Sequence, residues 1–213
     1  MVSVAEPPRR ERKKRQTRDA LVHAALKLFD AKGYEHTAVR EITDAVDVSE
    51  RTFFRYFANK EDLAVSFVRD ASSAFIRELA VRPPEEEPLA ALRNAFAASL
   101  HAVTADDVNP GEESVYLLVM RLVDSTPSLL AAYLRFLHDR DDELVRVLAE
   151  REGVDPVSDL RPRIAAVVFG GLVASANKGW RNEGHRTMDE MLAAFDAYLA
   201  QIGPALAGHW TAR

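Results

Sequence analysis

The sequence predicts an all-α fold, in which a small N-terminal three-helix domain precedes a larger helical domain, with about nine helices in total. Two observations support this prediction. Sustained alternation of apolar and polar residues, the pattern of a half-buried strand, is nearly absent from the 213 residues. Apolar residues instead recur at helical spacing, and proline and glycine separate the helical segments from one another.

Composition excludes several kinds of protein. The chain has no cysteine, so structural disulfides, thiolate zinc sites and cysteine nucleophiles are ruled out. The basic N-terminus lacks the apolar stretch of a secretory signal, and the longest nearly apolar run, residues 164–176, is too short to cross a bilayer. We expect a soluble cytoplasmic protein that has no membrane partner.

The net charge of −5 hides an asymmetry along the chain. Residues 1–60 carry 13 Lys and Arg against 9 Asp and Glu, whereas residues 61–213 carry 15 against 24. Seven of the cations fall within residues 9–18. A basic segment on an acidic body favours local binding to nucleic acid, although a solvated tail has the same composition. We expect residues 1–14 to form a disordered basic arm that follows phosphates.

The first two helices are predicted from their apolar stripes and end signals. The first spans about residues 16–32, and Gly33 supplies the residue that commonly ends a helix. The second is short, about residues 39–46, and Thr37 is its candidate N-cap. Asp47 follows, and aspartate tolerates the left-handed backbone of a tight turn better than most residues.

The third helix is predicted over residues 50–57. Residues four apart share a face of a helix, so Phe53 and Phe57 form one apolar stripe. Arg51 and Arg55 point roughly the opposite way. The flanking positions are Thr52, Phe54 and Tyr56. The helix is therefore predicted to bury one face and to present the other, either to solvent or to a binding partner.

Two short helices joined by a tight turn, the second with basic and polar residues outward, form a helix-turn-helix. Ser49 and Asn59 are the candidate N-caps of the second of these helices and of the helix after it. The segment YEHTAVREITDAVDVSERTFFRYFANKEDL closely resembles the DNA-binding domain of the TetR family of bacterial transcriptional regulators. The shared features are T-A-V-R-E-I, V-S-x-x-T-F, the aromatic run F-R-Y-F and N-K-E-D-L. The resemblance covers roughly residues 15–65.

The resemblance implies a role for individual residues. It makes Arg40 a phosphate or base contact, Ser49 the cap that orients the third helix, and Lys60 a phosphate contact at the start of the fourth. The DNA-binding residues expected in this way are Arg40, Ser49, Glu50, Arg51, Thr52, Phe54, Arg55, Tyr56 and Lys60. Arg51 and Arg55 are the candidates for base edges, because a bidentate arginine on guanine is the commonest specific contact, although either could hold phosphate instead.

Two positions depart from the family pattern. Asp47 stands in the turn where the family usually has glycine, which leaves the turn possible but less free. Phe54 stands where the family usually has a tyrosine whose hydroxyl bonds a phosphate. Phenylalanine cannot make that bond, but its ring can pack on sugar carbons or on a thymine methyl group.

Six further helices are predicted over about residues 60–80, 88–105, 112–125, 128–152, 160–182 and 188–206. The effector-binding and dimerising domain of the family has this helix count and order. The resemblance therefore implies a helix-turn-helix domain over residues 15–60 and an effector and dimerisation domain over residues 61–213. It also implies that the last two long helices pair with their copies in a four-helix dimer interface. Small residues within 164–176 allow such an approach, although packing within one chain explains them equally well.

An effector pocket is expected between the middle helices. Its candidate lining residues are Phe96, Leu100, Tyr116, Met120, Phe136, Phe169 and Asn177, with His101 and His138 as further polar anchors. An ordinary core or surface position is the alternative for each of them. The sequence has no two-histidine metal spacing, nucleophile elbow or glycine-rich phosphate loop, so we expect no enzyme activity, cofactor or metal.

Together these observations predict a homodimeric, ligand-responsive transcriptional regulator. We expect a repressor that binds a palindromic double-stranded DNA operator and is released by a small hydrophobic effector. The alternatives are an activator or corepressor-dependent regulator of the same fold, a small-molecule-binding protein with a vestigial DNA head, and an all-helical enzyme.

Overall fold

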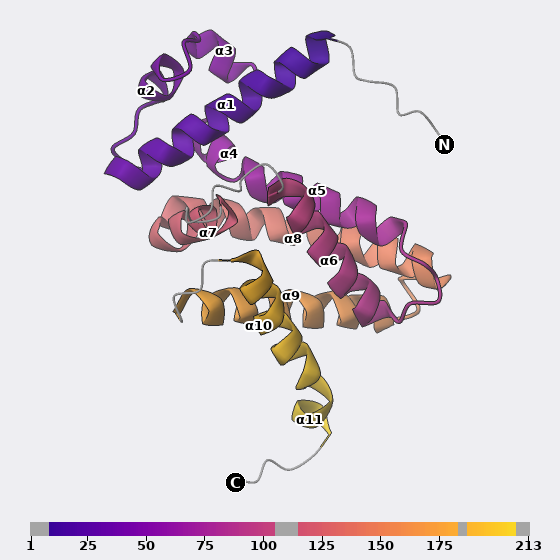
Figure 1. Ribbon diagram of the computed structural model, residues 1–213. Helices are drawn as coiled ribbons and strands as arrows, with labels where there is room; N and C mark the ends of the chain where they lie inside the picture. Colours follow the sequence, from indigo (N-terminus) through magenta and orange to yellow (C-terminus); the bar gives the residue numbers. More distant parts are fainter. Residues whose placement is uncertain (1–8, 105–114, 183–186, 208–213) are drawn as a thin grey trace. The chain divides into compact units, whose positions relative to one another are not determined.

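The computed structural model describes residues 9–104, 115–182 and 187–207, and over these residues the chain forms eleven helices and no strand (Figure 1). The all-α prediction is therefore confirmed. The helices are α1 (Arg9–Lys32), α2 (Val39–Asp44), α3 (Glu50–Phe54), α4 (Lys60–Ala64), α5 (Ser66–Ala80), α6 (Pro88–Thr104), α7 (Val115–Ser125), α8 (Pro127–Glu152), α9 (Arg161–Asn182), α10 (Met188–Ala200) and α11 (Ile202–Leu206).

The described residues form two compact units. The first contains residues 9–69 together with 118–134, and the second contains the remainder. All of residues 15–60, expected as a DNA-binding domain, lie in the first unit, which also includes most of α7 and the start of α8. Helices α5, α7 and α8 each contribute residues to both units.

Helix α1 is longer than its apolar stripe predicts. It begins at Arg9, so residues 9–14, expected in a disordered arm, are helical, whereas residues 1–8 lie outside the described residues. Arginine, lysine and glutamate are good helix formers, and no glycine or proline interrupts this stretch. Gly33 ends the helix as predicted, with φ of +90° and its amide bonded to the Phe29 carbonyl at 2.9 Å.

The start of α2 differs from the prediction. Ala38, rather than Thr37, occupies the N-cap position, and the Ala38 amide donates to the Glu41 carboxylate at 2.8 Å. The Thr37 hydroxyl instead donates to the Gly33 carbonyl at 2.9 Å. Because Thr37 is almost fully buried, its hydroxyl needs this internal partner and is not available to cap the helix.

Three predicted helices are shorter or divided. The third ends at Phe54 instead of Phe57, and the fourth is interrupted at Val65, which separates α4 from α5. The last is interrupted at Gln201. Pro204 explains this last break, because its ring clashes with the carbonyl four residues earlier, and that residue is the end of α10.

Each unit has its own apolar core. In the first unit, α1 packs against α2 and α4, and α2 packs against α3 (Figure 1). In the second unit, α9 packs along α10 and both contact α6. The centre of the second unit is an aromatic cluster made of Phe75, Phe96, Phe169 and Phe195. The rings of Phe75 and Phe169 are stacked, with centroids 5.2 Å apart.

Candidate DNA-binding surface and effector site

The aromatic stretch of α3 is divided between the core and the surface. Phe53 and Phe57 are 0% and 2% exposed, with ring centroids 5.5 Å apart, and they fix the helix onto its unit. Phe54 is 55% exposed, although its ring meets Phe53 edge to face at 5.3 Å. The prediction that one face of this segment is buried and the other presented is therefore confirmed.

The turn before α3 is tight, as predicted. Asp47 has φ of +53°, the left-handed conformation that aspartate adopts more readily than most residues. The Val48 amide then bonds to the Thr43 carbonyl at 3.0 Å, which brings the start of α3 against the end of α2. The Ser49 hydroxyl caps α3, because it accepts from the Thr52 amide at 3.2 Å.

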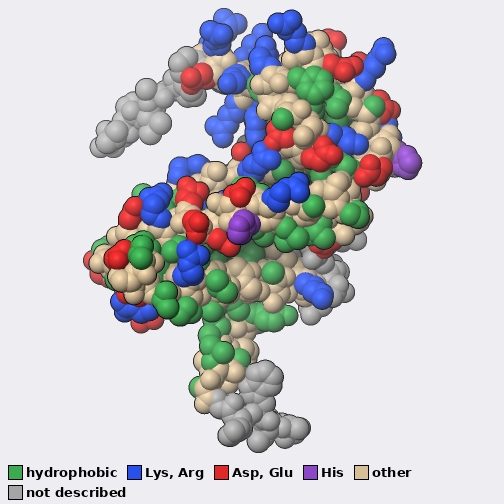
Figure 2. All heavy atoms as spheres, turned by 180° about the vertical axis from the view of Figure 1, so that it is seen from behind, with side chains coloured by type: hydrophobic (Ala, Val, Ile, Leu, Met, Phe, Trp, Pro, Cys, Tyr) green, Lys and Arg blue, Asp and Glu red, His purple; other side chains and the backbone are tan. Residues whose placement is uncertain are grey.

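Most of the residues expected to contact DNA are open to solvent. The exposed ones are Arg40, Ser49, Glu50, Arg51, Phe54 and Arg55, and the half-buried ones are Thr52, Tyr56 and Lys60. The Arg51 side chain makes no hydrogen bond or ion pair with the residues that the structure describes. Figure 2 shows Lys and Arg side chains gathered around this unit. The outward face of α3 thus combines exposed guanidinium groups with an apolar ring.

Arg55 and Lys60 are more constrained than Arg51. The Arg55 guanidinium lies 5.0 Å from the centroid of the Tyr56 ring, and its Nη2 is 3.3 Å from the Tyr56 hydroxyl. The Lys60 ammonium donates to the carbonyls of Tyr34 at 2.7 Å and Thr37 at 3.1 Å. The same ammonium lies 4.1 Å from the centroid of the Tyr34 ring, so Lys60 is held mainly by contacts within its own unit.

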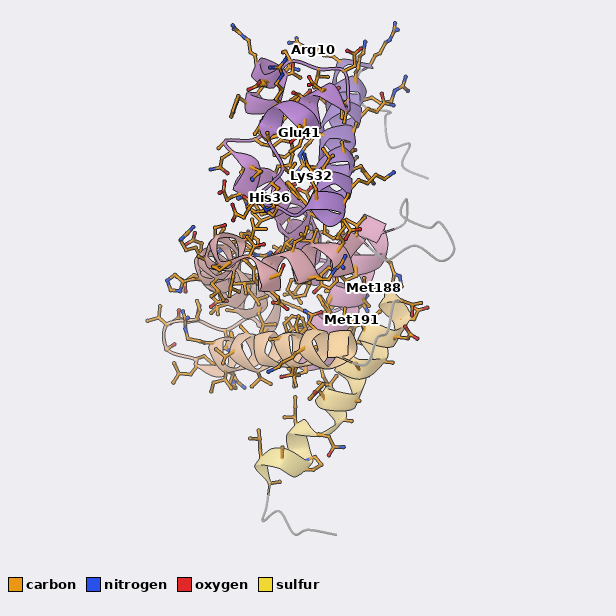
Figure 3. The ribbon with its side chains drawn as sticks, turned by 90° about the vertical axis from the view of Figure 1, so that its left-hand side faces the viewer. Arg10, Lys32, His36, Glu41, Met188 and Met191 are labelled. Carbon is orange, nitrogen blue, oxygen red and sulfur yellow. The ribbon has the colours of Figure 1, made fainter. Side chains whose placement is uncertain are left out.

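An ion pair that the sequence analysis did not predict fixes α2 against the end of α1. The Lys32 ammonium donates to the Glu41 carboxylate, and the same carboxylate accepts from the Ala38 amide (Figure 3). The hydrogen bond from Lys32 is the main reason that the pKa of Glu41 is lowered. The two residues are nine apart across a turn, so no helical spacing signals the pair.

The candidate effector residues fall into three groups. Tyr116 and Asn177 are both buried, and the Tyr116 hydroxyl lies 2.8 Å from the Asn177 amide nitrogen. Phe96 and Phe169 belong to the aromatic cluster, with centroids 5.7 Å apart. The other three are dispersed: Leu100 is buried in the second unit, Met120 is buried in the first unit, and Phe136 is half-buried on α8. His101 and His138 are exposed.

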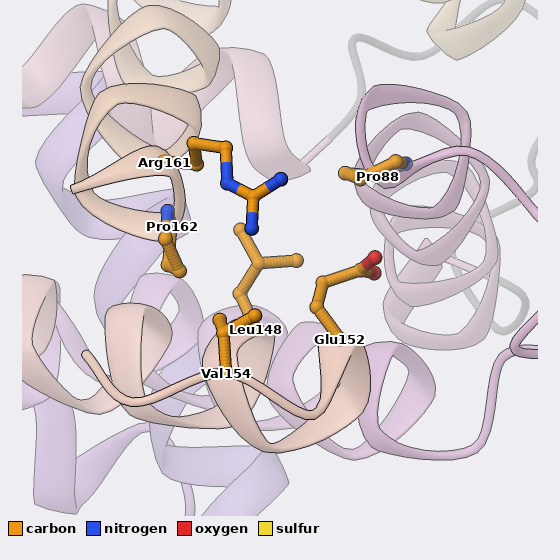
Figure 4. A pocket seen from close by; sticks show the side chains of 6 residues that line it. All are labelled: Pro88, Leu148, Glu152, Val154, Arg161 and Pro162. Atoms are coloured by element: carbon orange, nitrogen blue, oxygen red, sulfur yellow. The ribbon is translucent and has the colours of Figure 1, made fainter. Parts of the chain in front are cut away.

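One cavity lies at the corner where α8 leads into α9 (Figure 4). It is lined by Pro88, Leu148, Glu152, Val154, Arg161 and Pro162, none of which was expected at an effector site. Its volume of about 180 Å³ is below the roughly 300–1,000 Å³ of typical small-molecule sites. It does not correspond to the expected pocket.

The described residues contain neither a metal-binding cluster nor a helix that could span a membrane. Within the described parts of the chain, no group of three or more His, Asp or Glu side chains could hold a metal ion. Over the same residues, no helix is both long and apolar enough to cross a membrane.

A capped second helix that follows a tight turn and presents cations outward defines a helix-turn-helix DNA-binding protein. The family described as bacterial regulatory proteins, tetR family, matches residues 21–66, and the family described as MftR C-terminal domain matches residues 86–206. The regulator TcmR of Streptomyces glaucescens is 40% identical over 204 residues, which cover 96% of this chain and 90% of TcmR. The chain therefore belongs to the TetR family of bacterial transcriptional regulators.

Two more distant similarities agree with this assignment. The putative mycofactocin biosynthesis regulator MftR of Mycobacterium tuberculosis is 26% identical over 192 residues, covering 90% of this chain and 93% of MftR. The crystal structure of NalD, the secondary repressor of the MexAB-OprM efflux pump in Pseudomonas aeruginosa, superposes with a TM-score of 0.59. NalD is 18% identical, and the match covers 93% of this chain and all of NalD, so it supports the fold alone.

Proposed function

We propose that this regulator is a homodimeric repressor that leaves a near-palindromic operator when a small molecule binds its larger helical unit. The outward face of α3 carries the proposal, because Arg51, Phe54 and the C-cap residue Arg55 are exposed together. Buried Phe53 of α3 and buried Phe57 just after it anchor the segment. Such a face can insert into the major groove, where arginine reads guanine and an apolar ring contacts thymine methyl groups.

Dimerisation through α9 is supported by an exposed apolar stripe. Leu160, Ile164 and Val167 are 62%, 59% and 69% exposed, and the spacing continues through Gly171 and Ala174 on the same face. A Cβ atom added at Gly171 would meet no atom of the described residues within 4 Å, apart from the backbone of its own helix and its chain neighbours. Glycine inside a helix costs about 1 kcal/mol relative to alanine, so its presence here is better explained by close approach of a second chain.

A route from effector to DNA is supported by helices that the two units share. Helices α5, α7 and α8 contribute to both units, and within the first unit Arg121 of α7 pairs with Asp30 of α1 at 2.7 Å. A ligand that binds one arrangement of these helices more tightly would favour that arrangement and so change the DNA-binding unit. The change in the free energy of the equilibrium equals the difference in the ligand's binding free energy for the two arrangements, because a ligand that binds both equally moves no equilibrium.

The second unit is the proposed site of effector binding. We take the second unit to bind its effector without chemical turnover, and the protein to act in the cytoplasm, where bacterial DNA lies. The buried Tyr116–Asn177 pair and the aromatic cluster of the second unit suit an apolar ligand with few polar groups. An activator of the same fold would use the same α3 face, so the sign of regulation needs its own measurement.

The test is binding of purified protein to a pool of random duplexes, followed by release. The proposal expects a recovered inverted repeat whose affinity falls steeply with salt, and whose complex dissociates when effector is added. Placing the repeat upstream of a reporter gene separates repression from activation. Recovery of a motif that increases reporter output would contradict repression but retain the DNA-binding assignment.

A further inference from the structure

Arg140 of α8 is an inward-facing cation that neither the DNA-binding surface nor the dimer interface uses. Four acids surround it in the sequence, Asp139, Asp141, Asp142 and Glu143, and all four are exposed. Arg140 is instead half-buried, between half-buried Phe136 one turn before it and buried Leu144 one turn after it. The positions at 136, 140 and 144 form one inner face of the helix.

One nitrogen of the Arg140 guanidinium lacks the hydrogen-bond partner that a shielded charged group normally has. Its Nη1 is shielded from solvent and has no hydrogen-bond acceptor among the described residues. The group lies 5.6 Å from the centroid of the Phe136 ring, a cation–π contact. Burial lowers the pKa of Arg140, and the charges of Glu143 and Asp141 offset this only in part. A desolvated charge without a paired anion is costly, so this arrangement needs an explanation.

Arg151 shows what a structural arginine looks like on the same helix. It lies eleven residues further on, or three turns, and therefore on nearly the same face. Its Nη2 donates to the carbonyls of Pro83 and Glu86, both at 2.6 Å, and its Nη1 pairs with Glu152. Only its Nε is shielded from solvent without a partner among the described residues. Arg151 thus ties the segment between α5 and α6 to α8. Among the residues that the structure describes, Arg140 makes no such hydrogen bond to a carbonyl and no ion pair with a carboxylate.

We propose that Arg140 anchors an anionic oxygen group carried by an otherwise apolar effector, with the Phe136 ring packed against the same guanidinium. Arginine suits this role because its planar fork binds carboxylate, sulfonate or phosphate oxygens in bidentate fashion, and its charge is retained in the interior. The proposal rests on the proposed effector-binding function of the second unit and narrows its ligand class to amphiphilic anions.

The first test needs no ligand. Replacing an unpaired inward-facing arginine with methionine removes an uncompensated charge and keeps much of the volume, so Arg140→Met should raise the unfolding midpoint by about 2–4 °C. Arg151→Met should lower the midpoint, because it strands two carbonyls and a carboxylate. If Arg140→Met lowers the midpoint as Arg151→Met does, Arg140 is a structural residue and the proposal is overturned.

The second test uses two fluorescent probes that differ by one acidic group. 1-Anilinonaphthalene-8-sulfonate carries a sulfonate, and N-phenyl-1-naphthylamine is the same body without it. Wild-type protein should prefer the sulfonate, and Arg140→Met should weaken sulfonate binding roughly tenfold to hundredfold, with binding of the neutral probe unchanged. Arg146→Met, at an exposed arginine of the same helix, is the control and should change neither affinity.

Each outcome of the probe experiment is decisive. No preference of the wild-type protein for the sulfonate, or equal weakening of both probes in Arg140→Met, would overturn the anionic anchor. Binding is measured without DNA, so the result does not depend on the repressor assignment. If the protein selects the sulfonate but binds no duplex, the proposed function is refuted and the anion site at Arg140 is still supported.

Discussion

The adjacent phenylalanines of α3 offer the sharpest prediction, because they share a residue type and differ in environment. Phe53 is fully buried, so Phe53→Ala should cost about 3–5 kcal/mol, a large part of the roughly 5–15 kcal/mol that stabilises a typical domain. Phe54 is more than half exposed, and its main internal contact is edge to face with Phe53. Phe54→Ala should therefore cost about 1 kcal/mol or less.

In DNA binding the order should be reversed, with Phe54 contributing directly to affinity and Phe53 only through the fold. A phenylalanine offers about 200 Å² of surface, so 55% exposure leaves on the order of 100 Å² for a partner. If DNA covers half of that area, about 25 cal/mol per Å² gives roughly 1.3 kcal/mol per head, or close to tenfold in affinity. Phe54→Tyr should tighten binding instead, provided that the added hydroxyl reaches a phosphate.

Two assays measure these effects. Hydrogen exchange of the α1 and α3 amides reports on stability of the first unit without interference from the second. Fluorescence anisotropy with a selected duplex reports affinity, and only folded Phe54 variants are compared. Equal destabilisation by Phe53→Ala and Phe54→Ala, or undiminished DNA affinity of Phe54→Ala, would refute the division of this helix into a core face and a contact face.

Four further predictions concern the DNA-binding head and the α9 face. Arg55→Ala should weaken specific binding by about 1–3 kcal/mol per half-site and non-specific binding by less, in duplex titrations; equal weakening would make it a phosphate contact. Replacing the cations of residues 9–14 with glutamine should reduce the slope of log affinity against log salt concentration by about 0.9 for each phosphate that the protein no longer neutralises. An unchanged slope would show that this helical segment does not contact DNA. Asp47→Val should destabilise the first unit by about 1–2 kcal/mol, whereas Asp47→Gly should be close to neutral, and chemical denaturation distinguishes the two. Gly171→Leu should raise the dimer dissociation constant at least about tenfold in sedimentation experiments, with Gly171→Ala much milder, and an unaffected dimer would exclude this face of α9.

Features that depend on neighbours in sequence were predictable. The caps at Ser49 and Asn59, the end of α1 at Gly33 and the left-handed turn at Asp47 all occur where they were expected. In each case a side chain or backbone within a few residues determines the geometry. The division of the aromatic stretch followed in the same way from helical periodicity.

Features that depend on contacts across the fold were not predictable from spacing. From its place at a helix start, Lys60 is predicted to be an exposed phosphate contact. In the structure its ammonium group also donates to two carbonyls more than twenty residues earlier in the chain. Arg140 reads as one more charge in an acidic, solvated run, and only the packing of α8 reveals that it faces inward. Phe96 and Phe169 read equally well as pocket or core, and the structure packs both into one aromatic cluster.

The proposed function depends above all on two copies of the α3 face reading an inverted DNA repeat. Selection of bound sequences from random duplexes at near-physiological salt tests this, carried out in parallel for the wild-type protein and an Arg51→Ala, Arg55→Ala double variant. We predict an inverted repeat for the wild type, with half-sites about one helical turn apart, and disappearance of that motif in the variant. Enrichment of no motif by the wild type, or of the same motif by both proteins, would contradict this reading of α3.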